Sequence, residues 1–578
     1  MTPKEIDKEY CGEQLGTKNT PKRESSMRLI ILNMFLLAVA SPSPAGDFKP
    51  TEDAAHAMEA IVPSSLMSHI RFLSHDLLEG RAPGTRGDEL SRTYIASQME
   101  LIGLKPGAGD GSWFQPVPIL SMTADPSMKI TVSRASNNLS FSFRTDFVAV
   151  AGSQAERVEL KDAELVFVGY GIDAPEQKWD DYKGVDLRGK VLLMLNNDPS
   201  PDDPKEFAGK ARLYYGRWTY KYEIAGKKGA AGALIIHTRE SAGYGWNVVE
   251  SSWSGEQFEL EKQPGAAAAQ LNGWATFEAT KKILELAGKD YDALVASAQD
   301  RSFKPVPLGV TVSTTIETKI RKVMTTNVLG LLPGSDPKLK DEVVVYTAHY
   351  DHLGVGNAVD GDSIHNGALD NASGVSAMLN ISASFTYQKE PPRRTILFIA
   401  IAAEESGLIG SKYYSERPTF HPGKIAANIN IDGINIFGKT RDVIMVGLGK
   451  SSIDNVVKDV ADWQGRVVKP DQFPEQGFFY RSDQFNFAKI GVPCLYMDPG
   501  VEYIGKPADF GKQMVEEYIQ KNYHQPSDEV GDWDLSGAVE DIRLLYLVGH
   551  TVANSNAMPS WNKGDEFEGA RLRALGGR

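Results

Sequence analysis

The chain has 578 residues, of which 42% are hydrophobic and 24% are charged, and its formal net charge is −13. These proportions are ordinary for soluble globular proteins and exclude a disordered or collagen-like chain. At roughly 150 residues per domain, the length predicts three or four domain-sized units. The acidic balance, with no long basic run, argues against nucleic acid as a partner, because a phosphate backbone is bound by a basic surface.

The chain has only two cysteines, Cys11 and Cys494, and ten histidines. Two cysteines exclude a disulfide scaffold, and they also exclude a zinc site built from thiolates. Any metal ion must therefore be held by histidines and carboxylates.

An apolar segment near the N-terminus is typical of an export signal. Residues 29–40 read LIILNMFLLAVA, with Arg28 before them and small residues after them. Such a segment is too short to span a bilayer, which takes about twenty residues. We therefore predict a signal peptide over 27–45 and export to the periplasm or the medium, the alternative being a buried core helix. The polar prefix 1–26 is unusual before a signal, and we expect it to be an artefact of gene annotation, with translation beginning at Met27.

The next segments combine helix and strand patterns. Helical periodicity predicts helices over 64–79 and 87–104, with a turn-rich stretch between them. Alternation of apolar and polar residues then predicts strands over 128–133 and 139–150.

The texture of the sequence changes between residues 155 and 305. Strand-like runs there are separated by Gly- and Asp-rich turns, and a helix is expected near 276–299. The runs are 163–170, 190–195 and 232–237. We predict a β-rich α+β insert over 155–305 within a discontinuous domain of residues 50–150 and 315–560. Residues 561–578 would form a polar tail.

Four apolar runs in the C-terminal half predict a sheet. They cover residues 343–346, 396–401, 425–431 and 492–496. Helical stretches such as 372–387 and 452–464 lie between them. Continuous apolar strands alternating with helices are typical of a parallel sheet covered on both faces. The predicted fold class is α/β, with a largely parallel central sheet flanked by helices.

Polar residues follow these runs at the points where the strands are expected to end. In open α/β sheets, ligands bind beyond the carboxyl ends of the strands. The candidates in chain order are His349, Asp351, Asp370, Glu404, Glu405, Asp432 and His524. All of them are expected at the same edge of the sheet.

Two histidines and three carboxylates of this set suit a pair of divalent cations such as zinc, although Co²⁺ or Mn²⁺ could use the same ligands. The five residues are His349, Asp370, Glu405, Asp432 and His524. Their combined charge of about −3 suits two ions, whereas one ion would leave uncompensated negative charge in a semi-buried cleft. Asp370 is the simplest bridge between the two ions.

The neighbouring Glu404 has a different predicted role. Neighbours on an extended chain point to opposite sides, so a turn must bring Glu404 back over the cleft if Glu405 binds metal. There it can act as a general base towards water. Asp351 is placed to orient the imidazole of His349. Six other histidines are interpreted as structural, namely His56, His69, His75, His237, His421 and His550, whereas His352 and His365 are possible supporting residues.

The five motifs that contain these residues resemble the co-catalytic zinc aminopeptidases. They are TAHYDHLG at 347–354, NGALDNASG at 366–374, AAEESG at 402–407, NID at 430–432 and YH at 523–524. That family includes aminopeptidase Y and secreted bacterial leucyl aminopeptidases, and more distantly glutamate carboxypeptidase and the transferrin receptor. The resemblance covers about 60–145 and 320–555.

The resemblance implies a secreted exopeptidase that removes N-terminal residues from peptides by a metal-activated water. It implies two zinc ions on the five ligand residues, with Asp370 bridging, Glu404 as general base and Asp351 as support. Peptides or proteins would be the substrates, with neither nucleic acid nor a stable membrane span involved.

Two further segments resemble parts of the same family. The insert, with LRGKVLL at 187–193 and AGKKGAAGALII at 225–236, resembles the protease-associated domain, which would overhang the cleft and restrict which peptides enter. Arg481, Ser482 and Asp483 resemble a loop near the substrate pocket and are candidate substrate-binding residues.

Three alternatives remain open at this stage. A carboxypeptidase or another amidohydrolase could use the same metal centre, and an arginine cluster would favour it, yet only Arg481 lies near the pocket motifs. A receptor-like binding protein could use the insert for partners, although no ligand position is substituted. An uncleaved signal would instead anchor the chain as a membrane-bound ectodomain.

Overall fold

The structure is a computed structural model that describes residues 48–199, 207–209, 211–242 and 244–576. The signal peptide predicted over 27–45 and the prefix 1–26 lie outside these residues. None of the helices in the described ranges is long and apolar enough to cross a membrane. The described residues from 48 onward belong to one compact unit.

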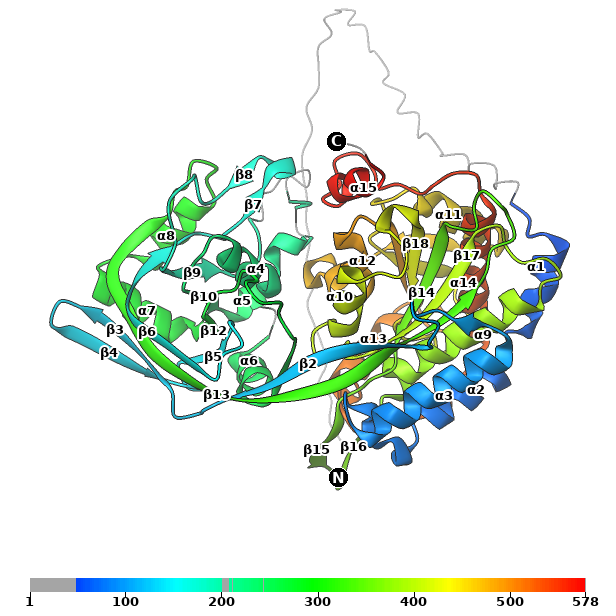
Figure 1. Ribbon diagram of the computed structural model, residues 1–578, viewed down its shortest axis with the longest axis horizontal. Helices are drawn as coiled ribbons and strands as arrows, with labels where there is room; N and C mark the ends of the chain where they lie inside the picture. The colour runs from blue at the N-terminus through cyan, green and yellow to red at the C-terminus, as the bar shows by residue number, and fades with distance from the viewer. Residues whose placement is uncertain (1–47, 200–206, 210, 243, 577–578) are drawn as a thin grey trace, which may run out of the picture. The chain divides into compact units, whose positions relative to one another are not determined.

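The C-terminal half contains the predicted parallel sheet, which we call the C-terminal sheet (Figure 1). Its central strands are β14 (Val343–His349), β17 (Thr395–Ile401), β18 (Ile425–Asn430) and β21 (Cys494–Asp498). They lie in the order β17–β14–β18–β21, and every neighbouring pair is parallel. At the edges, β13 (Val306–Leu332) pairs antiparallel with β17, and β19 (Asp442–Val446) pairs antiparallel with β21. The four predicted strands and the α/β fold class are confirmed.

Helices cover both faces of this sheet. The main ones are α9 (Ser373–Tyr387), α10 (Ile409–Glu416), α11 (Ile453–Trp463), α12 (Gln484–Lys489) and α14 (Ser536–Asn554). Val344 and Tyr346 of β14 share a hydrophobic core with α9 and α14, whereas Val343 and Val345 share another core with α12. Side chains of a strand alternate between its faces, so a strand buried on both faces is apolar at every position.

The N-terminal helices confirm the predicted periodicity but differ at their ends. They are α2 (Pro63–Leu73) and α3 (Arg86–Ile102). The first was expected to reach residue 79, yet α2 ends at Leu73 and a separate 3-10 turn covers Asp76–Arg81. At the end of that turn, the backbone of Glu79, Gly80 and Arg81 has positive φ angles of 49°, 66° and 56°. That conformation is incompatible with a continued right-handed helix.

The second sheet, which we call the insert sheet, contains parallel and antiparallel strands. Its strands in spatial order are β5 (Phe147–Ala151), β12 (Leu271–Thr276), β10 (Gly232–His237), β9 (Val191–Leu195), β6 (Arg157–Phe167), β13, β3 (Lys129–Arg134) and β4 (Asn137–Ser142). Strands before residue 155 therefore complete this sheet, which differs from the predicted insert boundaries of 155–305. The reason is hydrogen bonding: β3, β4 and β5 find their ladder partners here and not in the C-terminal sheet.

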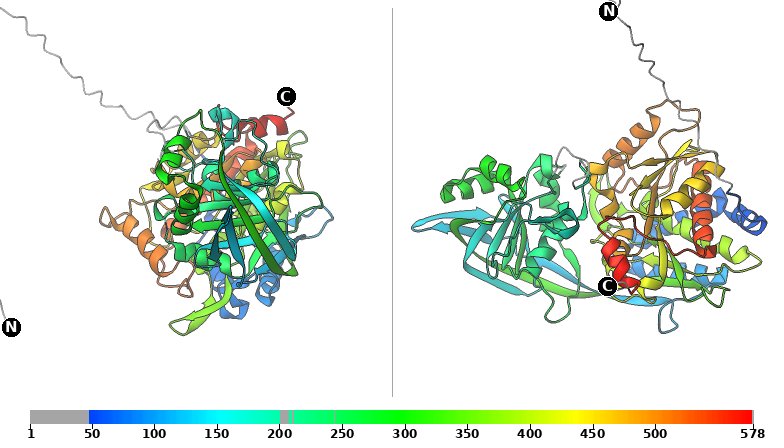
Figure 2. Two further views of the ribbon diagram at one scale, coloured as in Figure 1. Left: turned by 90° about the vertical axis from the view of Figure 1, so that its left-hand side faces the viewer. Right: turned by 90° about the horizontal axis from the view of Figure 1, so that it is seen from above.

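One strand joins the two sheets. β13 is 27 residues long, and it pairs with β6 and β3 through its first half. Its second half pairs with β2 (Phe114–Ala124) and β17. Figures 1 and 2 show β13 and β2 running together between the sheets.

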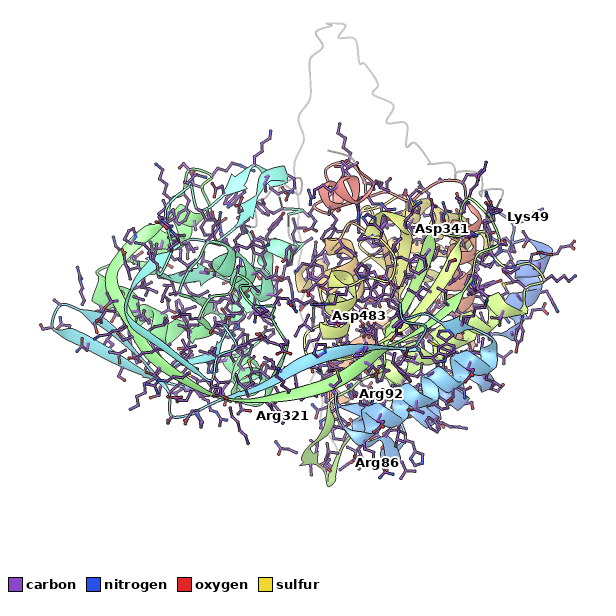
Figure 3. All side chains as sticks on the ribbon, in the orientation of Figure 1. Lys49, Arg86, Arg92, Arg321, Asp341 and Asp483 are labelled. Carbon is purple, nitrogen blue, oxygen red and sulfur yellow. The ribbon has the colours of Figure 1, made fainter. Side chains whose placement is uncertain are left out.

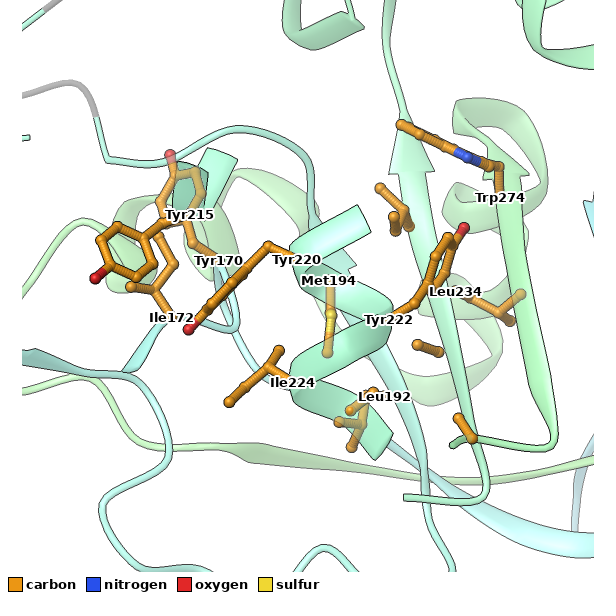
Figure 4. Packing of buried hydrophobic residues seen from close by; sticks show 14 of the residues in the cluster. Tyr170, Ile172, Leu192, Met194, Tyr215, Tyr220, Tyr222, Ile224, Leu234 and Trp274 are labelled. Atoms are coloured by element: carbon orange, nitrogen blue, oxygen red, sulfur yellow. The ribbon is translucent and has the colours of Figure 1, made fainter. Parts of the chain in front are cut away.

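The core of the insert lies beneath α4 (Trp218–Lys227), a ten-residue helix. Tyr220 and Ile224 of this helix share a hydrophobic core with Leu192 and Met194 of β9 (Figure 4). These contacts hold the N-terminal end of α4 in a defined position.

The start of α4 is also tied to the segment around α12. The backbone N–H of Arg212 donates to the carbonyl oxygen of Pro474 at 3.1 Å. The ring of Tyr214 lies 5.0 Å from that of Phe485, centroid to centroid.

The remaining elements are shorter or peripheral. They are α1 (Glu52–Ala57), α5 (Arg239–Ala242), α6 (Trp246–Ser254), α7 (Phe277–Ala287), α8 (Tyr291–Ala298), α13 (Phe510–Lys521), α15 (Glu568–Ala574), β1 (Lys105–Pro106), β7 (Asp173–Ala174), β8 (Trp179–Asp180), β11 (Gln257–Leu260), β15 (Gly354–Val359), β16 (Asp362–His365) and β20 (Val467–Pro470). The predicted helix near 276–299 is therefore two helices, α7 and α8, because Gly288 ends the first with a φ of 67°.

Candidate metal centre

The ends of the parallel strands bring the candidate residues together. His349 is the last residue of β14, Glu404 and Glu405 follow β17, and Asp432 follows β18. Because these strands are parallel and adjacent, their carboxyl ends meet at one edge of the sheet. His524 reaches the same place from the loop after α13.

Two histidines each face their own carboxylate and share Asp370. His349 Nε2 lies 3.2 Å from Asp432 Oδ1 and 3.3 Å from Asp370 Oδ1. His524 Nε2 lies 3.0 Å from Glu405 Oε2 and 3.4 Å from Asp370 Oδ2. The two oxygens of Asp370 are therefore divided between the two histidines.

The loop that carries Asp370 is held by a residue that the sequence analysis did not identify. Asp370 lies in the helical turn η5 (Ala368–Ala372), just before α9. The buried carboxylate of Asp528 accepts the backbone N–H of Leu369 at 3.1 Å and that of Asp370 at 3.0 Å. Asp528 stands only four residues after His524, so the segment that supplies one candidate ligand also supports another.

A turn redirects Glu404 and Glu405, as the sequence predicted it must. Ala403 has a positive φ of 56°. The carboxylate of Asp351 accepts the backbone N–H of Glu404 at 3.0 Å and that of Glu405 at 3.3 Å. Both glutamates then point to the site, and Glu404 Oε2 lies 3.9 Å from His349 Nε2.

Asp351 supports His349 less directly than expected. His349 Nδ1 lies 3.3 Å from the backbone carbonyl oxygen of Asp351 and 3.9 Å from its carboxylate. The main contact of the carboxylate is therefore with the turn after β17, and the carbonyl is the nearer partner of the imidazole.

His352 also belongs to the site. Its Nδ1 lies 2.6 Å from Glu405 Oε1, on the oxygen of Glu405 that does not face His524. Its ring meets that of His524 edge to face at 5.8 Å. His365, the other uncertain histidine, ends β16, and no hydrogen bond or ion pair joins it to a candidate ligand among the described residues.

A buried arginine, Arg81, stabilises the loops that carry the candidate ligands, and the sequence did not identify it. The Arg81 guanidinium donates from Nε to the carbonyl oxygen of Tyr350 at 2.7 Å and from Nη2 to that of Gly367 at 3.0 Å. It thereby connects the end of β14 with the loop before Asp370. Burial lowers the pKa of Arg81 to about 10, although nearby carboxylates, Asp351 first among them, oppose that shift.

Burial and the close approach of charged groups shift the pKa values of histidines and carboxylates in the site. Burial alone would lower the pKa of His524, but Glu405 and Asp370 outweigh it and raise that pKa to about 10. Burial and the charge of Asp370 would raise the pKa of Glu405, but His524 and His352 outweigh them and hold it at about 2. Burial is also the main cause that raises the pKa of Glu404 well above its usual value.

The donor set fits a metal ion. Among the described residues, two groups of three side chains each bring their ligand atoms within 4.8 Å of one another, and both groups contain His349. One adds Asp370 and Glu405, and the other adds Glu404 and Asp432. His524 Nε2 is buried and has no hydrogen-bond partner among the described residues, although carboxylate oxygens lie near it. Buried polar atoms in proteins are almost always paired, so imidazole and carboxylate atoms arranged in this way suit a cation.

The predicted substrate loop is only partly open to a ligand. Ser482 is buried, and its hydroxyl accepts the side-chain N–H of Asn430 at 2.8 Å. Asp483, labelled in Figure 3, is fully buried, and burial raises its pKa to about 7. Arg481 is half-buried, with its guanidinium 5.1 Å from the ring centroid of Phe478.

Residues 327–547 match the model of peptidase family M28, and this segment contains every candidate ligand. Probable leucine aminopeptidase 2 from Aspergillus fumigatus is 25% identical over 382 residues, which cover 63% of this chain and 66% of that protein. Aminopeptidase YwaD from Bacillus subtilis is 36% identical over 215 residues, which cover 35% of this chain and 39% of that protein. A probable zinc metalloprotease from Pyrenophora teres is 35% identical over 107 residues, covering 18% of this chain and 22% of that protein.

The chain thus spans less than two thirds of the length of these curated relatives. A solved aminopeptidase from Aneurinibacillus sp. strain AM-1 aligns with 87% of this chain and 97% of its own, at 18% identity and a TM-score of 0.47. The resemblance drawn from the motifs is confirmed over the M28 segment.

Proposed function

From the peptidase family M28 segment at 327–547, we propose that this chain is a zinc-dependent aminopeptidase that removes N-terminal residues from peptides. One observation carries the proposal: His349 and His524 each face a separate carboxylate and share the two oxygens of Asp370. That arrangement provides two neighbouring nitrogen–oxygen donor sets. The names of the relatives support the choice of peptides as substrates.

His349, Asp370, Glu405, Asp432 and His524 would hold two zinc ions, and the two oxygens of Asp370 face the two histidines. When bound, the ions would supply Lewis-acid polarisation of the substrate carbonyl and would make a water molecule acidic near neutral pH. His352 and Asp528 would orient the ligands Glu405 and Asp370 through their hydrogen bonds.

Glu404 would be the general base. It lies 3.9 Å from His349 Nε2 but outside the two histidine–carboxylate contacts that share Asp370. Its buried carboxylate can accept a proton from the attacking water and then donate it to the leaving amine. Asp351 positions it by accepting its backbone N–H.

The variant Glu404→Gln tests this assignment. It keeps the shape of the side chain and removes the proton acceptor, so we expect zinc binding to persist while kcat falls by about 10²- to 10⁴-fold. Glu416→Gln, the same change at an exposed position in α10, is the matched control and should retain activity. Zinc content by elemental analysis and kcat with an aminoacyl substrate are the two readouts. Near-normal kcat in Glu404→Gln would contradict the role of base.

Substrate type is tested by comparing free and N-blocked peptides before and after chelation. An aminopeptidase releases free N-terminal residues only from unblocked peptides, and it loses activity when its metal is removed. Cleavage of N-blocked peptides would instead identify a carboxypeptidase or an endopeptidase on the same centre. A chain without bound metal and without turnover would be a receptor-like binding protein.

We also propose that the protein is exported and that its insert is a protease-associated domain. The apolar run at 29–40 supports export, and the strands and helix of 187–237 support the insert assignment. N-terminal sequencing of the mature protein should find a start just after residue 40 or 45. Any peptide from residues 1–26 in the native source would contradict an internal start at Met27.

A further inference from the structure

Three arginines approach one another where the insert meets the segment before α12. Arg212 and Arg217 belong to the insert, and Arg217 is the residue immediately before α4. Arg481 follows the short helical turn Phe478–Tyr480. Arg481 stands more than 260 residues after the two insert arginines, so only the folded chain brings it near them.

Direct contacts place two of these arginines on the same short segment. The backbone N–H of Arg212 donates to the carbonyl of Pro474, and its Cβ lies 3.3 Å from the position of a Cβ built on Gly477. The guanidinium of Arg481 stacks over the ring of Phe478. Arg212 and Arg481 therefore both contact the segment 474–478.

The side chain of Arg217 has no hydrogen-bond or ion-pair partner within the part of the chain that the structure describes. Its Nε is buried and has no hydrogen-bond partner, and no carboxylate forms an ion pair with it among the described residues. Burial first, and then the cations of Arg481 and Arg212, lower its pKa to about 9. Arg217 as a whole is half-buried. A partly desolvated cation without a counter-charge is costly, and two further cations near it increase that cost.

The surroundings of Arg217 favour an anion rather than another kind of ligand. The only side-chain hydrogen bond of Arg212 within the described ranges runs from Nη2 to the carbonyl oxygen of Ser241 at 3.1 Å, which leaves most of its donors free. The N-terminal end of α4 adds the positive end of a helix dipole beside Arg217. Guanidinium groups bind carboxylates through paired hydrogen bonds.

Arg481 connects the cluster to the candidate metal centre through its chain neighbour Ser482. Arg481 precedes Ser482, whose hydroxyl accepts the side-chain N–H of Asn430. Asn430 ends β18 two residues before Asp432. A peptide whose scissile bond lies at the metal centre could therefore extend a carboxylate towards Arg481.

We propose that Arg212, Arg217 and Arg481 form a subsite that binds a carboxylate of the peptide substrate beside the metal centre. This inference rests on the proposed peptidase function and specifies its substrate class. The carboxylate has two possible sources, the C-terminus of a short peptide and an acidic side chain. In either case the insert contributes directly to substrate selection.

The test uses the zinc-loaded full-length protein and three peptides: Leu-Gly-Gly, its C-terminal amide, and the amide of Leu-Glu-Gly. Arg217→Gln should lower kcat/KM about 10- to 100-fold for a peptide that presents the recognised carboxylate, the range expected for a lost charged hydrogen bond. The amide of Leu-Gly-Gly should change less than about 3-fold. Loss confined to the free acid identifies the C-terminus, and loss confined to the Glu peptide identifies the side chain.

Arg239→Gln is the matched control, because this exposed arginine of α5 lies outside the cluster. Arg217→Lys should recover part of the kcat/KM that Arg217→Gln loses, because lysine restores the positive charge but not the paired N–H donors of a guanidinium group. If Arg217→Gln does not fold, Arg481→Gln makes the same test from a half-buried position. An equal loss of kcat/KM with all three peptides would overturn the subsite and leave a structural role.

Failure of the proposed function gives a different result. If the zinc-loaded wild type cleaves none of the peptides, the peptidase assignment is wrong. The subsite is then decided by calorimetric binding of Leu-Gly-Gly, of its amide and of the Leu-Glu-Gly amide. Tighter binding of a carboxylate-bearing peptide by the wild type, lost in Arg217→Gln, supports the subsite, and equal binding of all three contradicts it.

Discussion

Asp528 shows how a single residue can control the candidate metal centre without touching a metal. Its carboxylate accepts the backbone N–H groups of Leu369 and Asp370 and so fixes the loop that carries Asp370. The two carboxylate oxygens of Asp370 are the ones divided between His349 and His524. Removing those acceptors frees the loop. Residues that orient metal ligands typically contribute 10- to 100-fold to metal affinity.

We therefore expect Asp528→Ala to weaken zinc binding by about 10- to 100-fold, measured by competition with a chelator of known affinity. Glu529→Ala changes an exposed neighbouring carboxylate and should leave the affinity unchanged. Unaltered zinc affinity in Asp528→Ala would mean that the loop keeps its conformation without this support.

At the scale of single residues, the sequence predicted the candidate metal ligands better than the residues that hold those ligands in place. His349, Glu405 and Asp432 lie at or just beyond strand ends, which apolar patterns reveal. Arg81 and Asp528 act through backbone atoms of the loops at residues 350 and 367–370. Such contacts leave no local signature, since nothing in the sequence near Arg81 specifies a carbonyl 269 positions away.

At the scale of elements, the close approach of α9 to the end of β18 holds the two halves of the site together. Gly374 lies in the first turn of α9, where a built Cβ would lie 2.2 Å from Asn371 Oδ1 and 2.6 Å from the carbonyl oxygen of Ile431. Asn371 itself donates to that carbonyl at 3.0 Å. A side chain at position 374 must therefore displace α9 from the strand end that carries Asp432.

Gly374→Ala should destabilise the protein by about 1–3 kcal/mol, the usual cost of overpacking, and should lower activity as well. Thermal unfolding and kcat are the measurements. Gly569→Ala in α15 is the matched control, because its Cβ would meet nothing nearer than Arg573 Nη1 at 3.4 Å. A Gly374→Ala variant as stable and active as the wild type would show that α9 can move without cost.

The sequence predicted a strand correctly where a single pattern of apolar residues ran along the whole strand. It failed where the pattern changed within one strand. The buried strands β14, β17, β18 and β21 are continuous apolar runs, which are distinctive in sequence. β13 alternates buried and exposed residues over its first part and is buried throughout most of its last part. A strand that belongs to two sheets has a different spacing of buried residues in each, so no single sequence pattern identifies the whole strand.

At the scale of the whole molecule, β13 links the stability of the two sheets to metal binding. Without metal, the site gathers several buried carboxylates whose charges repel one another. A ligand that binds only the folded state stabilises it by about 2.7 kcal/mol at a free concentration 100 times its Kd. Zinc should therefore raise the melting temperature, and chelation should lower it.

A more specific prediction concerns which strands zinc stabilises. Because β13 pairs with β17 at one end and with β6 at the other, opening the C-terminal sheet removes a partner from the insert sheet. We expect zinc to slow hydrogen exchange in the β6–β13 ladder as well as in β14 and β18. Strand β4 serves as the internal reference, because its ladder partner is β3 and it has no ladder with β13 among the described residues. Protection restricted to residues 327–547 would mean that the two sheets unfold independently and that a metal ion at the strand ends stabilises only the sheet that binds it.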